Sequence, residues 1–177
     1  MKHLHARQSG FTLIELLVVI SIIAILASLS IPVVGRAIES ARRAQANTEV
    51  SSLATAIRAY YNEYSRFPQQ GEGIGEYIDG NGELMNILRA INGPGNVNHA
   101  NNRRRIVFME IAERSLSEGS PADFVDPWDD PYRVVVDINF DNQINVPQHG
   151  TLENRLIAVW SLGGNADDPS RHMTSWQ

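Results

Sequence analysis

The chain contains no cysteine, and its only lysine is Lys2. Without thiols it can form neither a disulfide scaffold nor a cysteine-ligated zinc or iron–sulfur site. Its 20 acidic and 15 basic side chains give a formal net charge of −5, which argues against a general nucleic-acid binder. Charge is also missing locally, because Glu15 is the only charged residue from Phe11 to Gly35. We therefore do not expect the chain to be a single soluble domain.

The uncharged stretch predicts a transmembrane helix over residues 11–34. At ~1.5 Å per residue, about 24 residues reach on the order of 36 Å, enough to cross a hydrocarbon core of ~30 Å. A secretory signal peptide has a shorter apolar region, and a buried core helix of a soluble protein would show a polar face. The basic residues on the two sides of the stretch do not decide its orientation.

Glu15 is the exception within this apolar stretch. A carboxylate near the centre of a bilayer costs about 2.5 to 3.5 kcal/mol on insertion scales, and such residues are functional candidates by default. Because Glu15 lies close to one end of the stretch, its side chain could instead extend to the lipid headgroups. Taken alone, the residue leaves both interpretations open.

The residues around Glu15 form a specific pattern. A short basic leader ends in Ser9-Gly10, and Phe11-Thr12-Leu13-Ile14-Glu15 then opens the apolar run. This pattern resembles the signature of the type IV pilin and pseudopilin superfamily. The resemblance implies that a prepilin peptidase cuts between Gly10 and Phe11 on the cytoplasmic side and methylates the new Phe11 amine. It also implies that Glu15 serves in assembly, paired with the amine of a neighbouring subunit.

The remainder of the chain predicts three further regions. Apolar side chains at helical spacing, from Val50 to Tyr64, indicate that an amphipathic helix over 35–66 continues the membrane helix and stops before Phe67-Pro68. Residues 67–125 read as a variable loop region with a short helix over 83–92. The segment 126–177 predicts an antiparallel sheet and an acidic tail, with strands at 133–136 and 156–160.

Together these regions predict a pilin-like α+β fold. A long N-terminal helix, membrane-spanning in its first half and amphipathic in its second, packs on a small antiparallel C-terminal sheet. The order of elements, with Asp126-Pro127-Trp128-Asp129-Asp130-Pro131-Tyr132 before the sheet, is most similar to the major pseudopilin of type II secretion systems. One departure is Asp129-Asp130, where such pseudopilins usually have Gly-Asn.

Aspartates in the last third raise the question of a calcium site. Residues 121–177 hold nine acids and three arginines, and Asp137, Asn139, Asp141 and Gln143 are spaced like the start of an EF-hand-type loop. Gln148 stands where such a loop has its bidentate glutamate, and an Asx-rich turn explains the spacing equally well. The resemblance to major pseudopilins implies calcium in the head with the acidic tail, here Asp167 and Asp168, as further candidate ligands.

The sequence does not predict an enzyme, because its histidines are scattered and it has no Gly-x-Ser-x-Gly or His-Glu-x-x-His motif.

The resemblance implies a structural subunit of a periplasmic pseudopilus, anchored once in the bacterial inner membrane with its head in the periplasm. Its partners would be prepilin peptidase, identical subunits, other pseudopilins and an inner-membrane assembly platform, with no nucleic acid. A type IV pilin for adhesion, motility or DNA uptake is the alternative, and a membrane-tethered calcium-binding module is a third possibility.

Overall fold

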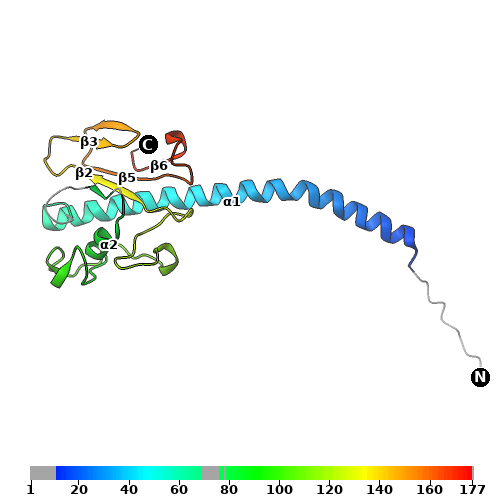
Figure 1. Ribbon diagram of the computed structural model, residues 1–177, viewed down its shortest axis with the longest axis horizontal. Helices are drawn as coiled ribbons and strands as arrows, with labels where there is room; N and C mark the ends of the chain where they lie inside the picture. The colour runs from blue at the N-terminus through cyan, green and yellow to red at the C-terminus, as the bar shows by residue number, and fades with distance from the viewer. Residues whose placement is uncertain (1–10, 69–75, 78, 177) are drawn as a thin grey trace, which may run out of the picture. The chain divides into compact units, whose positions relative to one another are not determined.

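The computed structural model describes residues 11–68, 76–77 and 79–176, without the side chains of 29–33 and 76–77. The predicted leader, residues 1–10, lies outside the described part. The chain divides into two units, Met1–Ala41 and Arg42–Gln177, here called the N-terminal and C-terminal units. Helix α1, Leu13–Tyr64, begins in the first unit and ends in the second (Figure 1).

In the C-terminal unit, α1 buries one stripe of side chains. Its members recur at intervals of three or four residues, as one face of a helix requires: Ala46, Val50, Leu53, Ile57 and Tyr60. The helix ends where Ser65 takes a positive φ of 51°, three residues before Pro68. The helix predicted from the sequence pattern is therefore confirmed, with its end at Tyr64.

The sheet of the C-terminal unit has four antiparallel strands in the order β1-β2-β5-β6. Their bounds are β1 Glu76–Tyr77, β2 Arg133–Val136, β5 Ile157–Ser161 and β6 Met173–Thr174. A separate hairpin pairs β3, Gln143–Val146, with β4, Gly150–Glu153. The predicted strand 133–136 matches β2, whereas the predicted strand 156–160 is displaced by one residue from β5. The α+β class and the antiparallel sheet are confirmed.

Both faces of the sheet are covered. Val134 and Val159 pack into the cluster formed with α1, whereas Val135 and Trp160 pack into a second cluster with Ile144 of β3. Successive side chains of a strand point to opposite faces, so α1 covers one face of the β2–β5 pair and the hairpin covers the other. In Figure 1 the sheet lies on one side of this part of α1, and α2, Gly82–Leu88, lies on the other.

The region between α1 and β2 is held together by buried asparagines. Asn81 donates from Nδ2 to the Phe124 and Tyr132 carbonyls, both at 2.8 Å, and its Oδ1 accepts from the Phe124 amide at 2.7 Å. Asn102 likewise donates to the Ile87 carbonyl at 2.8 Å and accepts the Tyr64 hydroxyl. These bonds satisfy backbone groups that would otherwise be buried without partners.

The predicted helix over 83–92 is wrong at its C-terminal end, because α2 stops at Leu88. Ala90 takes a positive φ of 56°, and the Ile91 amide bonds the Asn86 carbonyl instead of continuing the helical ladder. Two short 3₁₀ turns follow in the same region, at Val97–His99 and Glu113–Ser115, and a third precedes β6 at Pro169–Arg171.

The turn that leads into β2 depends on Asp126, which is buried. Its Oδ1 accepts the Trp128 and Asp130 amides, and its Oδ2 accepts the Ser161 hydroxyl at 2.5 Å. Burial raises the pKa of Asp126 above its ordinary value. Within this turn Asp129 takes a φ of 69°, a conformation that glycine adopts most readily. The turn therefore forms with an aspartate in this conformation.

Candidate functional site

The N-terminus of α1 carries a reciprocal capping box built from Thr12 and Glu15. The Thr12 amide and hydroxyl donate to Glu15 Oε2 at 2.8 and 2.7 Å, and the Glu15 amide donates to Thr12 Oγ1 at 3.3 Å. The first amides of a helix have no partner within the helix, so these bonds satisfy two of them and define where α1 begins. The side chain of Glu15 is therefore oriented by its own helix start.

The cap occupies one oxygen of the Glu15 carboxylate. Both bonds from Thr12 reach Oε2, and Oε1 makes no hydrogen bond with any described residue. Phe11, four residues earlier, has 81% of its surface exposed.

Described residues of the N-terminal unit present an uncovered apolar surface. All side chains from Phe11 to Ser28 are exposed, including Leu13 at 87%. Within the part of the chain that the structure describes, no helix meets the length and hydropathy needed to cross a bilayer. The predicted span 11–34 includes residues 29–33, whose side chains are outside the description, so the span stays a prediction.

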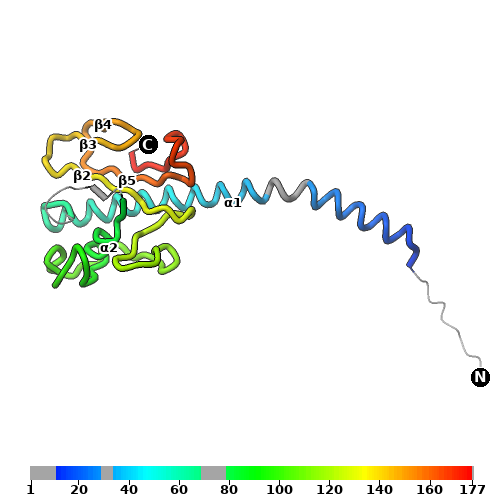
Figure 2. The backbone as a smooth tube through the Cα atoms, in the orientation of Figure 1, coloured from blue at the N-terminus to red at the C-terminus, as the bar shows by residue number. Residues whose placement is uncertain are grey.

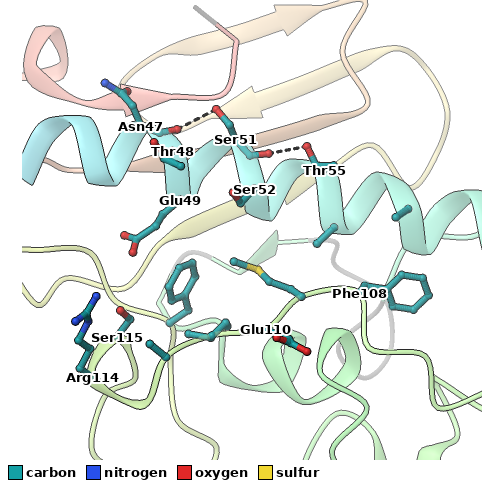
Figure 3. A pocket seen from close by; sticks show the side chains of 16 residues that line it. Asn47, Thr48, Glu49, Ser51, Ser52, Thr55, Phe108, Glu110, Arg114 and Ser115 are labelled. Atoms are coloured by element: carbon teal, nitrogen blue, oxygen red, sulfur yellow. Dashed lines mark hydrogen bonds between the residues drawn. The ribbon is translucent and has the colours of Figure 1, made fainter.

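An open groove of about 870 Å³ runs along α1 in the C-terminal unit (Figure 3). One wall is α1, and the other is the segment from Phe108 to Ser115. The hydroxyls of Thr48, Ser51 and Thr55 on the helix wall donate to carbonyls one turn earlier in α1. Among the residues that the structure describes, those lining the groove include no histidine.

Three of the predicted calcium ligands, Asp137, Asn139 and Asp141, lie in the loop between β2 and β3, and the fourth, Gln143, is the first residue of β3. Asp141 accepts the Asn139 side-chain amide at 2.9 Å and the Gln143 backbone amide at 2.8 Å. Asp137 is 3% exposed, and its Oδ2 accepts the Asn142 amide at 2.8 Å. The other oxygen of Asp137, Oδ1, is buried without a hydrogen-bond partner. Calcium prefers oxygen ligands, so this unpaired carboxylate oxygen is a candidate ligand for it.

The two predicted tail ligands lie in another loop, just before β6. Asp168 Oδ1 accepts the Ser170 hydroxyl at 2.6 Å, and this bond lowers the pKa of Asp168. No bond among the described residues joins Asp167 or Asp168 to the 137–143 loop. In the described ranges no group of three or more His, Asp or Glu side chains is placed to hold a metal.

Thr12 was missed as a functional residue. The spacing Thr12-x-x-Glu15 is a capping-box signature that is recognisable from the sequence alone. From the sequence we expected Glu15 to pair with another subunit. In the structure its nearest partner is Thr12, three residues earlier in the same chain. Gly10 lies outside the described residues.

Comparisons with known proteins concern this same end of the chain. Residues 5–31 match the family described as the prokaryotic N-terminal methylation motif. The type II secretion system core protein G of Pectobacterium carotovorum is 40% identical over 68 residues, which are 38% of this chain and 44% of the relative. The same protein of Dickeya chrysanthemi is 36% identical over 72 residues, 41% of this chain and 47% of the relative.

The type IV major pilin protein PilA of Myxococcus xanthus is 36% identical over 69 residues, 39% of this chain and 31% of the relative. The chain thus spans less than half the length of each of these three relatives. No solved structure matches the chain significantly. The predicted resemblance is confirmed by these matches: the chain carries the N-terminal methylation motif and is similar, over its matched segment, to type II secretion core protein G and to a type IV pilin.

Proposed function

We propose that this chain is a structural subunit of a type II secretion-like pseudopilus, assembled through its N-terminal helix after cleavage and N-methylation. The observation that carries the proposal is the start of α1, where the methylation motif coincides with the Thr12–Glu15 cap. In this role the chain is a substrate of prepilin peptidase and performs no catalysis itself.

Cleavage after Gly10 supplies the partner that Glu15 lacks. It creates an amine on Phe11, and in a filament the amine of one subunit would meet Glu15 Oε1 of the next. Pairing opposite charges in a low-dielectric environment offsets part of the desolvation cost of each. Because the cap already orients the carboxylate, the pair would also set the register between neighbouring helices.

The exposed apolar side chains of Phe11–Ser28 must be shielded from water both before and after the subunit assembles. Before assembly a bilayer would supply this shielding, which supports a single inner-membrane anchor. The periplasmic side of the C-terminal unit rests on the likeness to type II secretion core protein G. After assembly the helices of identical subunits would replace lipid. Other pseudopilins and an inner-membrane platform are the further partners of this proposal.

Expression in a bacterium that has a type II secretion assembly apparatus but lacks its own major pseudopilin tests the proposed function. We expect mature chain in the sheared filament fraction and restored secretion. If the chain stays in the membrane fraction, while the host's own major pseudopilin assembles when it is returned to the same strain, the proposal is wrong. Filaments that form without restored secretion would favour the type IV pilin alternative, which the similarity to PilA supports.

We further propose that the loop of Asp137, Asn139, Asp141 and Gln143 binds calcium. The buried Oδ1 of Asp137 without a hydrogen-bond partner is the observation that supports it. An ion there would bind two segments of a unit that has no disulfide, because β2 ends and β3 begins on either side of the loop. Only the folded state holds these oxygens together, so calcium would stabilise the fold by mass action.

Calcium is therefore expected to raise the melting temperature of the full chain in detergent. At a hundredfold excess over its dissociation constant it adds about 2.7 kcal/mol, which corresponds to roughly 5 to 10 °C for a chain of this size. Asp137→Asn should remove most of this shift, whereas Asp167→Asn, in the separate loop, should retain it. Identical melting curves with calcium and with chelator would contradict the proposal.

A further inference from the structure

Two histidines that are distant in sequence face each other beside the sheet. His149 lies in the turn between β3 and β4, and His172 immediately precedes β6. His149 Nε2 and His172 Nδ1 are 3.0 Å apart, with ring centroids 5.1 Å apart and rings inclined by 63°. The pair joins residues 172–176, here called the C-terminal segment, to the β3–β4 hairpin. Figure 2 shows the C-terminal end of the chain beside this hairpin.

The hydrogen bonds of His172 decide which of its nitrogens carries a proton. Nε2 lies 3.3 Å from the Asn165 carbonyl oxygen, which can only accept, so Nε2 carries the hydrogen. Nδ1 then presents a lone pair to His149, and His149 Nε2 donates to it. Metal-binding histidines are commonly oriented in this way. One ring nitrogen donates to a backbone carbonyl, and the lone pair of the other nitrogen is left to bind the ion.

We propose that His149 Nε2 and His172 Nδ1 form a binding site for a first-row transition-metal cation such as Zn²⁺. Two nitrogens bound to one tetrahedral zinc at 2.0–2.1 Å lie about 3.3 Å apart, so the nitrogens would separate by a few tenths of an ångström and the rings would turn until both lone pairs point at the ion. Binding exchanges the hydrogen of His149 from Nε2 to Nδ1, and no net proton is released. Water completes the coordination.

The surroundings favour this chemistry over a hard cation. The neutral imidazole is the form that binds metal. Imidazole nitrogens suit zinc, copper and nickel, whereas the 137–143 loop offers only oxygen. With two protein ligands, the site is weaker than a four-ligand structural zinc site. A bound ion would link the C-terminal segment to the β3–β4 hairpin.

Calorimetric titration of the full chain with ZnCl₂ in detergent tests the site. His3→Ala and His5→Ala serve as the background, because these leader imidazoles would bind zinc on their own. We expect one Zn²⁺ per chain, with affinity at least tenfold lower in His149→Gln. Glutamine can still donate a hydrogen bond to His172 Nδ1 but provides no imidazole. The matched control His99→Gln, a histidine outside the pair, should bind as the background chain does.

A second readout does not depend on the folding of a ligand variant. Trp176 packs edge-on against His149, with ring centroids 5.3 Å apart, so Cu²⁺ bound at the pair should quench its fluorescence and Zn²⁺ should reverse the quenching by competition. Trp176→Phe should reduce the quenched amplitude. Absence of saturable zinc binding, equal affinity in the His149→Gln and His99→Gln chains, or quenching that zinc does not reverse would each overturn the proposal.

Discussion

Glu15→Ala is expected to leave processing intact and to abolish filament assembly. Removing one partner of a buried charge pair costs about 3 to 5 kcal/mol, because the other charge is left in a low-dielectric environment without compensation. Since each 1.4 kcal/mol is a factor of ten, subunit association should weaken more than a hundredfold. The measurement is the amount of mature chain in the sheared filament fraction relative to the membrane fraction.

Two further variants separate the charge of Glu15 from its capping role. Glu15→Gln keeps an oxygen that can accept from Thr12 but removes the charge, so it should assemble almost as poorly as Glu15→Ala. Thr12→Ala removes the two hydrogen bonds of the Thr12 hydroxyl but keeps the bond from the backbone amide and the carboxylate, and it should still form filaments. Normal assembly of both Glu15 variants would contradict the charge pair between Glu15 and the Phe11 amine.

Gly10→Leu is expected to accumulate as an uncut precursor. A glycine has no side chain, which lets the leader lie close to the peptidase at the bond to be cut, and a leucine there would prevent this approach. Co-expression with prepilin peptidase should show a single unshifted band for the variant. Gln8→Leu introduces the same side chain two residues earlier and should be cut normally. If Gly10→Leu is processed as fast as Gln8→Leu, the cleavage site lies elsewhere.

Sequence patterns predicted the elements that are determined by residues close together in the sequence. The 3.6-residue period from Val50 to Tyr64 and the proline at 68 defined the end of α1, and the β-branched run of β2 defined its strand. The end of α2 was not predicted, because Asn86 bonds to Pro94 and Ile91 beyond the helix. A sequence pattern contains no signal for that competition.

The candidate sites show the same division. Asp137 and Asn139 are close in sequence, so their spacing indicated one loop, but the unpaired Oδ1 of Asp137 follows from burial that spacing cannot reveal. His149 and His172 are brought together only by the pairing of β5 with β6 and the fold of the hairpin. Asn81 similarly reaches Phe124 and Tyr132 across the chain. Long-range contacts of this kind need the structure.

The proposed filament subunit requires a new N-terminus at Phe11. The intact mass of the chain, recovered from cells that contain prepilin peptidase, reports this N-terminus. We expect a species that lacks residues 1–10 and carries one added methyl group on Phe11. A full-length mass, or a new N-terminus at any residue other than Phe11, would contradict it.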